Sequence, residues 1–249
     1  MIGTGHLVGH PWSLAVEEQF YLVWPMVVLL FGRRSLIAIT AIIVVTAVAV
    51  RFAMVDNGDF GVRIFVFSPA RMDGLAVGAG IALLVRSSWG RAFLSAAAWP
   101  VAGAALMGLV ALFIYEGGLP PFDPTVIRVG FSLLAALFGG LVAAVVLAPP
   151  ASTISRMFSW RPLAAFGKYS YAVYVIHFPV IQLLVRHTDI AQDARSWAGF
   201  PLAGTFAVAL VASAITLLFT LLSWKLLETP FLSLKSRFSS GRVQMSWGD

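Results

Sequence analysis

Residues 12–25 read WSLAVEEQFYLVWP and continue without a break into the apolar run Met26–Phe31. Two adjacent carboxylates, Glu17 and Glu18, therefore stand at the mouth of a predicted membrane helix over Ser13–Phe31. A charged side chain within a membrane helix costs about 2.5–3.5 kcal/mol on insertion scales, and such residues are usually functional. The stretch thus predicts a membrane-spanning fold and a polar site near one end of the first helix.

The composition of the whole chain is also that of a membrane protein. Of the 249 residues, 59% are hydrophobic and 11% are charged, whereas a soluble domain has about 25% charged residues. Cysteine is absent, which excludes a disulfide framework and thiolate chemistry. The net charge of +6 raises the question of nucleic acid. The basic residues, however, lie in short clusters between apolar runs, as in membrane proteins, so we expect no nucleic-acid partner.

We expect an all-α fold, a polytopic transmembrane bundle of about seven helices, because a membrane helix needs about 20 mainly apolar residues. The first segment is weakened by its two glutamates, and the third is short. No internal repeat divides the chain, so residues 1–249 are interpreted as a single domain. The seven predicted segments are Ser13–Phe31, Ser35–Val55, Pro69–Val85, Ala92–Tyr115, Val126–Leu147, Pro162–Val185 and Phe200–Leu226.

The charges of the predicted loops indicate an orientation. Loops rich in Lys and Arg stay in the cytoplasm, so the basic tail 229–249 is predicted to be cytoplasmic, and seven crossings then place Met1 outside. The basic set comprises Arg33, Arg34, Arg86, Arg91, Arg156, Arg161, Lys168, Lys225, Lys235, Arg237 and Arg242. The opposite, mixed set comprises Asp56, Asp59, Arg63, Glu116, Asp123, Arg186, Asp189, Asp193 and Arg195.

Polar side chains form a stripe on the first predicted helix. Their spacing of i, i+4, i+8 and i+11 puts four of them on one face: Ser13, Glu17, Tyr21 and Trp24. Glu18 is rotated about 100° away. The stripe predicts a cavity at the outer membrane surface. Interfacial anchoring by an aromatic belt is the alternative, and spacing alone leaves both open. His10 would lie at the same outer edge, either at the site or without a role.

Residues 68–78 read SPARMDGLAVG and begin the third segment, with Ser68 as the predicted N-cap and Pro69 at the first helical position. Arg71 and Asp73 are two positions apart on a helix and do not face each other, so each is expected to have a partner elsewhere, and for Arg71 the candidates are Glu17–Glu18. Arginine's fork suits either a structural ion pair or direct binding of an acyl or sugar oxygen, and both readings remain open. Arg51, at the same depth, is expected to snorkel to the interface.

Residues 166–179 read FGKYSYAVYVIHFP and belong to the sixth segment. Ser170, Tyr174 and His177 share one helix face, and His177 would lie about 22 Å into a helix that enters from the cytoplasm. An intramembrane histidine of this kind is either a buried structural residue or a general base, because its pKa range fits acyl transfer to a hydroxyl.

These motifs resemble the signatures of the acyltransferase-3 family of integral membrane proteins. Residues 12–25 resemble WSL-(S/A)-VEEQFY-L-x-WP, and residues 71–78 resemble R-x-D-G-L-x-x-G. Residues 167–179 resemble G-x-x-SY-x-x-Y-x-x-H-x-P, and residues 228–232 resemble the closing motif E-x-P-F-L. The resemblance covers essentially the whole chain.

The resemblance implies an O-acyltransferase of the plasma membrane that moves an acyl group, commonly acetyl, from acyl-CoA to a hydroxyl. The acceptor would be an extracytoplasmic glycan, a lipid-linked sugar or a similar molecule, membrane lipid would surround the protein, and no bound cofactor or metal is expected. The catalytic candidates are Glu17, Glu18, Arg71 and His177. The substrate-binding candidates are His10, Ser13, Tyr21, Trp24, Asp73, Ser170 and Tyr174.

The family pattern also implies segments before Met1. Family members have three more helices and both termini in the cytoplasm, and their favoured base, a histidine of the first helix, and an upstream arginine would precede Met1. We therefore interpret the chain as the C-terminal part of such a protein, with a genuine seven-helix protein as the alternative. A membrane carrier and an inactive scaffold remnant are the alternative functions.

Overall fold

The computed structural model describes residues 12–59, 61–187 and 201–230. These residues form helices joined by turns and contain no strand, which confirms the prediction of an all-α fold. The chain divides into two units, which are described separately: an N-terminal unit, Pro11–Phe158, and a C-terminal unit, Ser159–Asp249 together with Met1–His10. The basic tail 231–249 lies outside the described residues.

The N-terminal unit contains the first five predicted segments, with small shifts at their ends. The longest helix starts at Ser88 rather than Ala92, because the Ser87 side chain accepts a hydrogen bond from the Gly90 N–H and caps it. The elements are α1 Trp12–Leu30, α2 Arg33–Asp56, α3 Val62–Val66, the 3₁₀ turn η1 Ser68–Ala70, α4 Asp73–Leu84, α5 Ser88–Glu116, the π-helical turn η2 Val126–Gly130, α6 Phe131–Leu147 and α7 Thr153–Phe158.

The predicted third segment is not one helix. Ser68 was expected to cap a helix beginning at Pro69, but η1 ends at Ala70 and α4 begins only at Asp73. The Ser68 hydroxyl instead lies 2.5 Å from Gln19 Oε1 of α1. This break leaves Arg71 between two helical elements rather than inside one.

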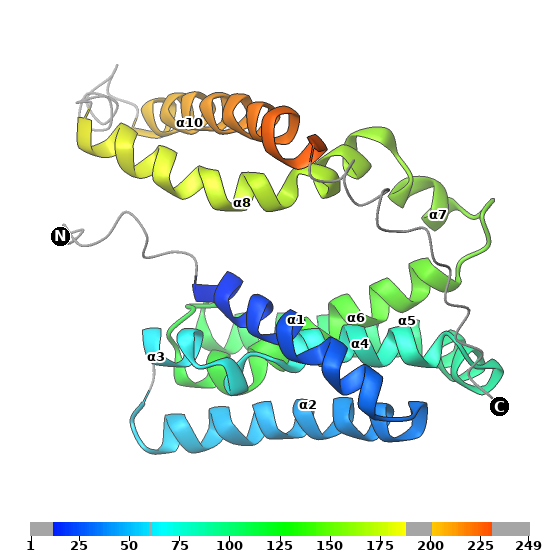
Figure 1. Ribbon diagram of the computed structural model, residues 1–249. Coiled ribbons are helices and arrows are strands. Elements are labelled where there is room, and N and C mark those ends of the chain that lie inside the picture. The colour runs from blue at the N-terminus through cyan, green and yellow to red at the C-terminus, as the bar shows by residue number, and fades with distance from the viewer. Residues whose placement is uncertain (1–11, 60, 188–200, 231–249) are drawn as a thin grey trace. The chain divides into compact units, whose positions relative to one another are not determined.

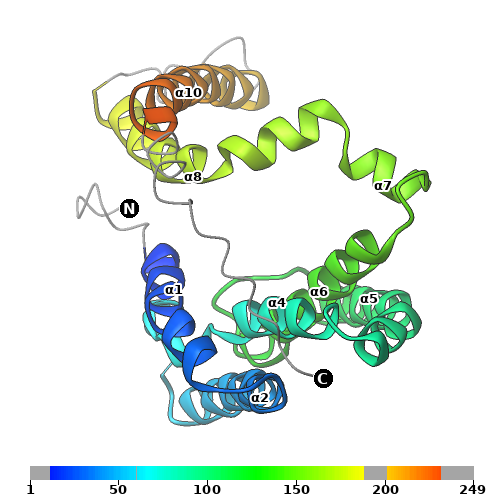
Figure 2. The same ribbon diagram turned by 45° about the vertical axis from the view of Figure 1, so that its right-hand side comes forward.

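Helices α2, α4, α6 and α5 pack side by side in that order, as Figures 1 and 2 show. Figure 2, turned by 45°, also shows α1 beside α2. Gly140 of α6 packs directly against α5, where an added Cβ would lie 2.7 Å from the Ala98 carbonyl oxygen and 2.9 Å from the Ala102 Cβ. Small residues at such crossings let membrane helices approach closely, and here they set the α5–α6 contact.

The carboxylates of the N-terminal unit gather at one of its ends, together with four arginines, whereas the charged residues at the other end are all basic. These carboxylates lie near the start of α1, the end of α2, the start of α4 and the connection from α5 to η2, which we call the carboxylate end: Glu17, Glu18, Asp56, Asp59, Asp73, Glu116 and Asp123. An ion pair between Arg128 and Asp56 joins η2 to α2 there. The opposite, basic end carries Arg33, Arg34, Arg86, Arg91 and Arg156. The separation is the one on which the predicted orientation rests.

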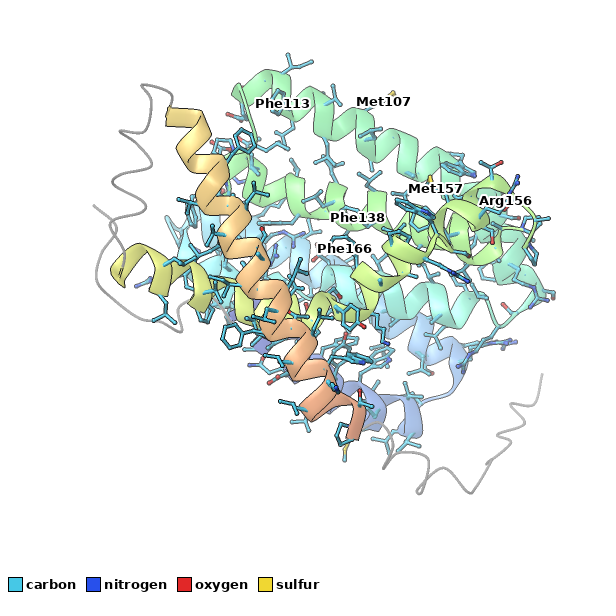
Figure 3. The ribbon with its side chains drawn as sticks, turned by 90° about the horizontal axis from the view of Figure 1, so that it is seen from above. Met107, Phe113, Phe138, Arg156, Met157 and Phe166 are labelled. Atoms are coloured by element: carbon cyan, nitrogen blue, oxygen red, sulfur yellow. The ribbon has the colours of Figure 1, made fainter. Side chains whose placement is uncertain are left out.

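Four described helices are long and apolar enough to cross a membrane: 33–56, 88–116, 126–147 and 208–226. Helix α4 is apolar but has only 12 residues. Apolar side chains such as Met107 and Phe113 of α5 are largely exposed (Figure 3), which suits a lipid environment. Four of the seven predicted crossings are thus confirmed by length and composition, and the other three remain predictions.

In residues 159–187 and 201–230, the described part of the C-terminal unit, two long helices lie side by side (Figure 1). Helix α8 spans Arg161–His187, α10 spans Pro201–Ser223, and the π-helical turn η4 spans Trp224–Glu228. At one end, Lys168 Nζ lies 4.3 Å from the centroid of the Trp224 ring, a cation–π contact. The buried residues between the helices include Ala172, Val180, Ala212, Thr216 and Thr220.

Candidate functional site

A buried ion pair lies at the carboxylate end of the N-terminal unit. Arg51 of α2 is 0% exposed, and its Nη2 lies 2.8 Å from Asp73 Oδ2 at the start of α4. Its Nη1 donates to the Ala70 carbonyl at 2.7 Å, and its Nη2 donates to Ser132 Oγ at 2.5 Å. The expectation that Arg51 snorkels is therefore wrong, because η1 and α6 close over the guanidinium and keep it from the interface.

The Arg51 guanidinium connects four helical elements, α2, η1, α4 and α6. Asp73 is the first residue of α4, where the helix dipole favours a carboxylate, and its Oδ1 accepts the Gly74 N–H at 3.0 Å. Within the described residues, Arg51 Nε and Asp73 Oδ2 are buried without a well-angled hydrogen bond. The attraction between the two side chains is therefore mainly electrostatic, and it holds Asp73 toward α2.

Arg71 lies against aromatic rings. Its guanidinium carbon is 4.0 Å from the centroid of the Phe131 ring and 5.4 Å from that of Phe65. Within the described residues it makes no ion pair with Glu17–Glu18, so the predicted pairing is wrong. The reason is geometric: α1 turns Gln19 toward η1, where it bonds to Ser68, and both glutamates are exposed.

This cluster carries a net positive charge. Arg51 and Asp73 compensate each other at 2.8 Å, and the remaining cation is the half-buried Arg71. Its stacking on Phe131 occupies a face of the guanidinium and leaves the N–H groups in the plane of the fork. Those groups suit an oxyanion such as a phosphate or carboxylate.

A groove of about 350 Å³ runs from Arg71 and Asp73 between α4 and α6. Away from these two residues its walls are apolar or glycine: Gly74, Val77, Gly78, Ile81, Phe131, Leu134, Ala135, Phe138, Gly139 and Val142. One end of the groove is therefore charged, and the rest of it is apolar.

The polar stripe predicted on α1 is divided by the fold. Glu17, Glu18 and Tyr21 are exposed, whereas Trp24 is half-buried and stacks on Phe20 with ring centroids 5.1 Å apart. A second cavity of about 300 Å³ lies between α1 and α2, lined by Gln19, Phe20, Leu22, Val23, Trp24, Val27, Ile39, Ile43 and Met72. His10 and the side chain of Ser13 lie outside the described residues. Whether Glu17 and Glu18 differ in function stays a prediction.

The motif of α8 places three candidates on one helix of the C-terminal unit. The exposed Ser170 hydroxyl donates to the Gly167 carbonyl at 2.9 Å. His177 Nδ1 lies 3.1 Å from the Val173 carbonyl oxygen, and its ring centroid is 5.8 Å from that of Tyr174. A carbonyl only accepts, so Nδ1 is the donor, and a neutral imidazole in this tautomer has its basic lone pair on Nε2.

Several residues of the N-terminal cluster were missed by sequence reasoning. Arg51 carried a usable signal, since a charge five residues before the end of an apolar span needs a partner. Gln19 stood within a quoted motif without an assigned role, and Ser68 was predicted to cap a helix rather than to bond to Gln19. Ser132 and Phe131 had no signal, because only the α4–α6 packing brings them to Arg51 and Arg71.

Comparisons with known proteins agree with the motifs. The family model described as "Acyltransferase domain", acyltransferase family 3, matches residues 1–225. No solved structure gives a significant match.

Curated relatives with similar sequences carry names of O-acetyltransferases. The peptidoglycan O-acetyltransferase OatA of Listeria monocytogenes is 28% identical over 228 residues, 88% of this chain and 34% of that protein. The putative peptidoglycan O-acetyltransferase YrhL of Bacillus subtilis is 27% identical over 183 residues, 69% of this chain and 28% of that protein. The O-acetyltransferase OatA of Staphylococcus aureus is 27% identical over 186 residues, 69% and 29% of the two chains. The chain spans about a third of the length of the relatives it matches.

Proposed function

Because this chain belongs to the acyltransferase-3 family, we propose that it is part of a plasma-membrane enzyme that transfers an acetyl group from acyl-CoA to a hydroxyl of peptidoglycan. The observation that carries the proposal is the family match over residues 1–225, joined to relatives named as peptidoglycan O-acetyltransferases. The charge separation of the N-terminal unit supports an outward-facing carboxylate end, on the side where peptidoglycan lies.

The chemistry requires a base and a site for negative charge. The acceptor oxygen attacks the thioester carbonyl, a C–O bond forms, and the C–S bond breaks after a tetrahedral oxyanion. A base removes the hydroxyl proton, and the departing CoA sulfur takes up a proton. We assign His177 as the candidate base, because donation from Nδ1 to the Val173 carbonyl presents Nε2 as the basic atom. The histidine that the family pattern places before Met1 is the rival base.

We assign Glu17 to the acceptor side of the reaction. Glu17 and Tyr21 are one helical turn apart and both exposed at the carboxylate end, so they can bind sugar hydroxyls. Arg71 lies against Phe131 and Phe65 at the end of an apolar groove, and these surroundings suit an amphiphile better than a sugar.

The test uses the complete protein in membrane vesicles, with isotopically labelled acetyl-CoA and peptidoglycan fragments, and measures ester-linked acetyl by mass spectrometry. His177→Ala should lower the rate by about 10²–10⁴, the usual contribution of a general base. Asp59→Asn, which removes an exposed charge of the Arg63 pair, is the control and should keep the wild-type rate. A wild-type rate in His177→Ala would remove His177 as the base. If the wild-type protein acetylates peptidoglycan fragments equally well without acetyl-CoA, acetyl-CoA is not the donor.

A further inference from the structure

We propose that the α4–α6 groove binds one anionic phospholipid of the surrounding membrane, with its phosphate on Arg71 and one acyl chain along the groove. The proposal concerns the groove between α4 and α6 and does not depend on the acyl-transfer reaction. Three features of the groove support it: its charge, its shape and its direction.

The charge at the groove's end requires an anion. Asp73 pairs with Arg51 at 2.8 Å and also attracts Arg71 electrostatically, so one carboxylate faces two guanidinium groups and the cluster keeps one net positive charge. No other carboxylate of the described residues forms an ion pair with Arg71. A half-buried guanidinium that shares its counter-charge with a second one is costly in a membrane protein, and a phosphate can accept hydrogen bonds from two N–H groups of its planar fork. The chemistry at this end is therefore that of a phosphate.

The length of the groove suits an acyl chain rather than a polar ligand. Beyond Arg71 and Asp73 its lining has no other charged or polar side chain. Gly74 and Gly78 form part of the wall, and an added Cβ at either would meet nothing within 4 Å. These glycines therefore leave space unfilled, unlike Gly139 at the far part of the groove, where a Cβ would lie 2.5 Å from Val77 Cγ1.

The direction of the groove matches that of a lipid in one leaflet. From Asp73 to Ile81 the groove follows α4 for about 12 Å, close to half of the roughly 30 Å hydrocarbon core. The charged end of the groove lies at the carboxylate end of the unit. A lipid bound there would have its headgroup toward the membrane surface and its acyl chain toward the membrane centre, as in the bilayer. Phe138, 60% exposed on α6 (Figure 3), stands at the open side of the groove, where a chain would enter from the bilayer.

The experiment is photocrosslinking of the complete protein in phosphatidylcholine vesicles that contain a trace of phosphatidylglycerol with a diazirine in one acyl chain. The crosslinked peptides are identified by mass spectrometry. We expect labelling within residues 74–81 and 134–142, and much weaker labelling there by a phosphatidylcholine probe with the same diazirine chain.

Two variants test the two halves of the site. Arg71→Gln removes the phosphate partner and should lower phosphatidylglycerol labelling of 134–142 about tenfold, the effect of a charge-assisted hydrogen bond. Gly78→Leu fills the groove and should lower it equally. Gly103→Leu is the matched control, since Gly103 is an exposed glycine of α5 with nothing within 4 Å of an added Cβ, and it should leave labelling of 134–142 unchanged.

Three results would overturn the proposal. Equal labelling by both probes, insensitive to Arg71→Gln, would make the groove an ordinary lipid-facing surface. Displacement of the probe by acetyl-CoA, with a raised KM in Arg71→Gln, would assign the groove to the acyl donor. A rapid disulfide between cysteines placed at Gly78 and on α10, in a chain without native cysteine, would show that the protein itself fills the groove. Each readout is independent of whether peptidoglycan is the acceptor.

Discussion

At the scale of single residues, the buried Arg51–Asp73 pair is a strong constraint on the N-terminal unit. Asp73→Ala leaves a guanidinium with 0% exposure without its counter-charge, which should cost about 3–5 kcal/mol. The double variant Arg51→Met with Asp73→Leu should recover most of that loss, because it removes both buried charges. Thermal unfolding of the purified complete protein in detergent measures both effects.

The control for this prediction is the exposed pair Arg63–Asp59, whose aspartate side chain is 42% exposed. Asp59→Asn should change stability by about 0–1 kcal/mol. If Asp73→Ala lowers the unfolding temperature no more than Asp59→Asn does, the buried pair does not hold α2, α4 and α6 together.

The two adjacent glutamates of α1 provide a second prediction at this scale. Glu17 shares its helix face with Tyr21, and Glu18 does not, although both are exposed. Glu17→Gln should therefore reduce acetyl transfer strongly, because it removes the carboxylate assigned to the acceptor hydroxyls, and Glu18→Gln should reduce it less. The measurement is the initial rate at equal amounts of membrane-inserted protein. Equal tolerance of both variants would favour a role in interfacial anchoring.

At the scale of elements, the α5–α6 contact depends on Gly140. A Cβ there would lie 2.7 Å from the Ala98 carbonyl oxygen and 3.0 Å from the Ala102 backbone nitrogen, so the helices would have to separate. Gly140→Val should destabilise the protein by about 1–3 kcal/mol or more through overpacking. Gly103→Val, the same change at an open position of α5, controls for the helix propensity of valine. Equal unfolding temperatures for the two variants would contradict the close packing.

At the scale of the whole molecule, the charge separation predicts sidedness. Single cysteines replacing Arg91 or Ser155, near the basic end, should react only from the cytoplasm, and cysteines replacing Gly58 or Gly118 only from outside. The chain has no native cysteine, so each label reports one position. The physical reason is that clustered Lys and Arg resist translocation. Labelling of Gly58 and Arg91 variants from the same side would exclude the orientation, and with it an outward-facing Glu17.

The sequence by itself determined the helical fold, the family, and the positions of the long described helices to within a few residues, but not the short helices α3 and α7 or the break before α4. These properties depend on residues that are close together in the chain. Apolar runs form helices in a membrane, and Ser87 caps α5 by accepting a hydrogen bond from Gly90, three residues later. The family motifs are likewise contiguous stretches of sequence. The exposure of side chains on α1 does not follow the predicted stripe, since Glu17 and Tyr21 are exposed together, but Glu18 on another face is exposed as well and Trp24 is half-buried.

Only the tertiary structure decided which charges meet. Arg51 was expected at the interface and Arg71 beside Glu17–Glu18, yet Arg51 is paired with Asp73 and Arg71 lies on Phe131. The reason is that α4 begins after a break at Arg71 and packs between α2 and α6, a juxtaposition of residues far apart in the chain that no local pattern encodes. The same packing leaves Gly74 and Gly78 facing open space, and so creates the groove.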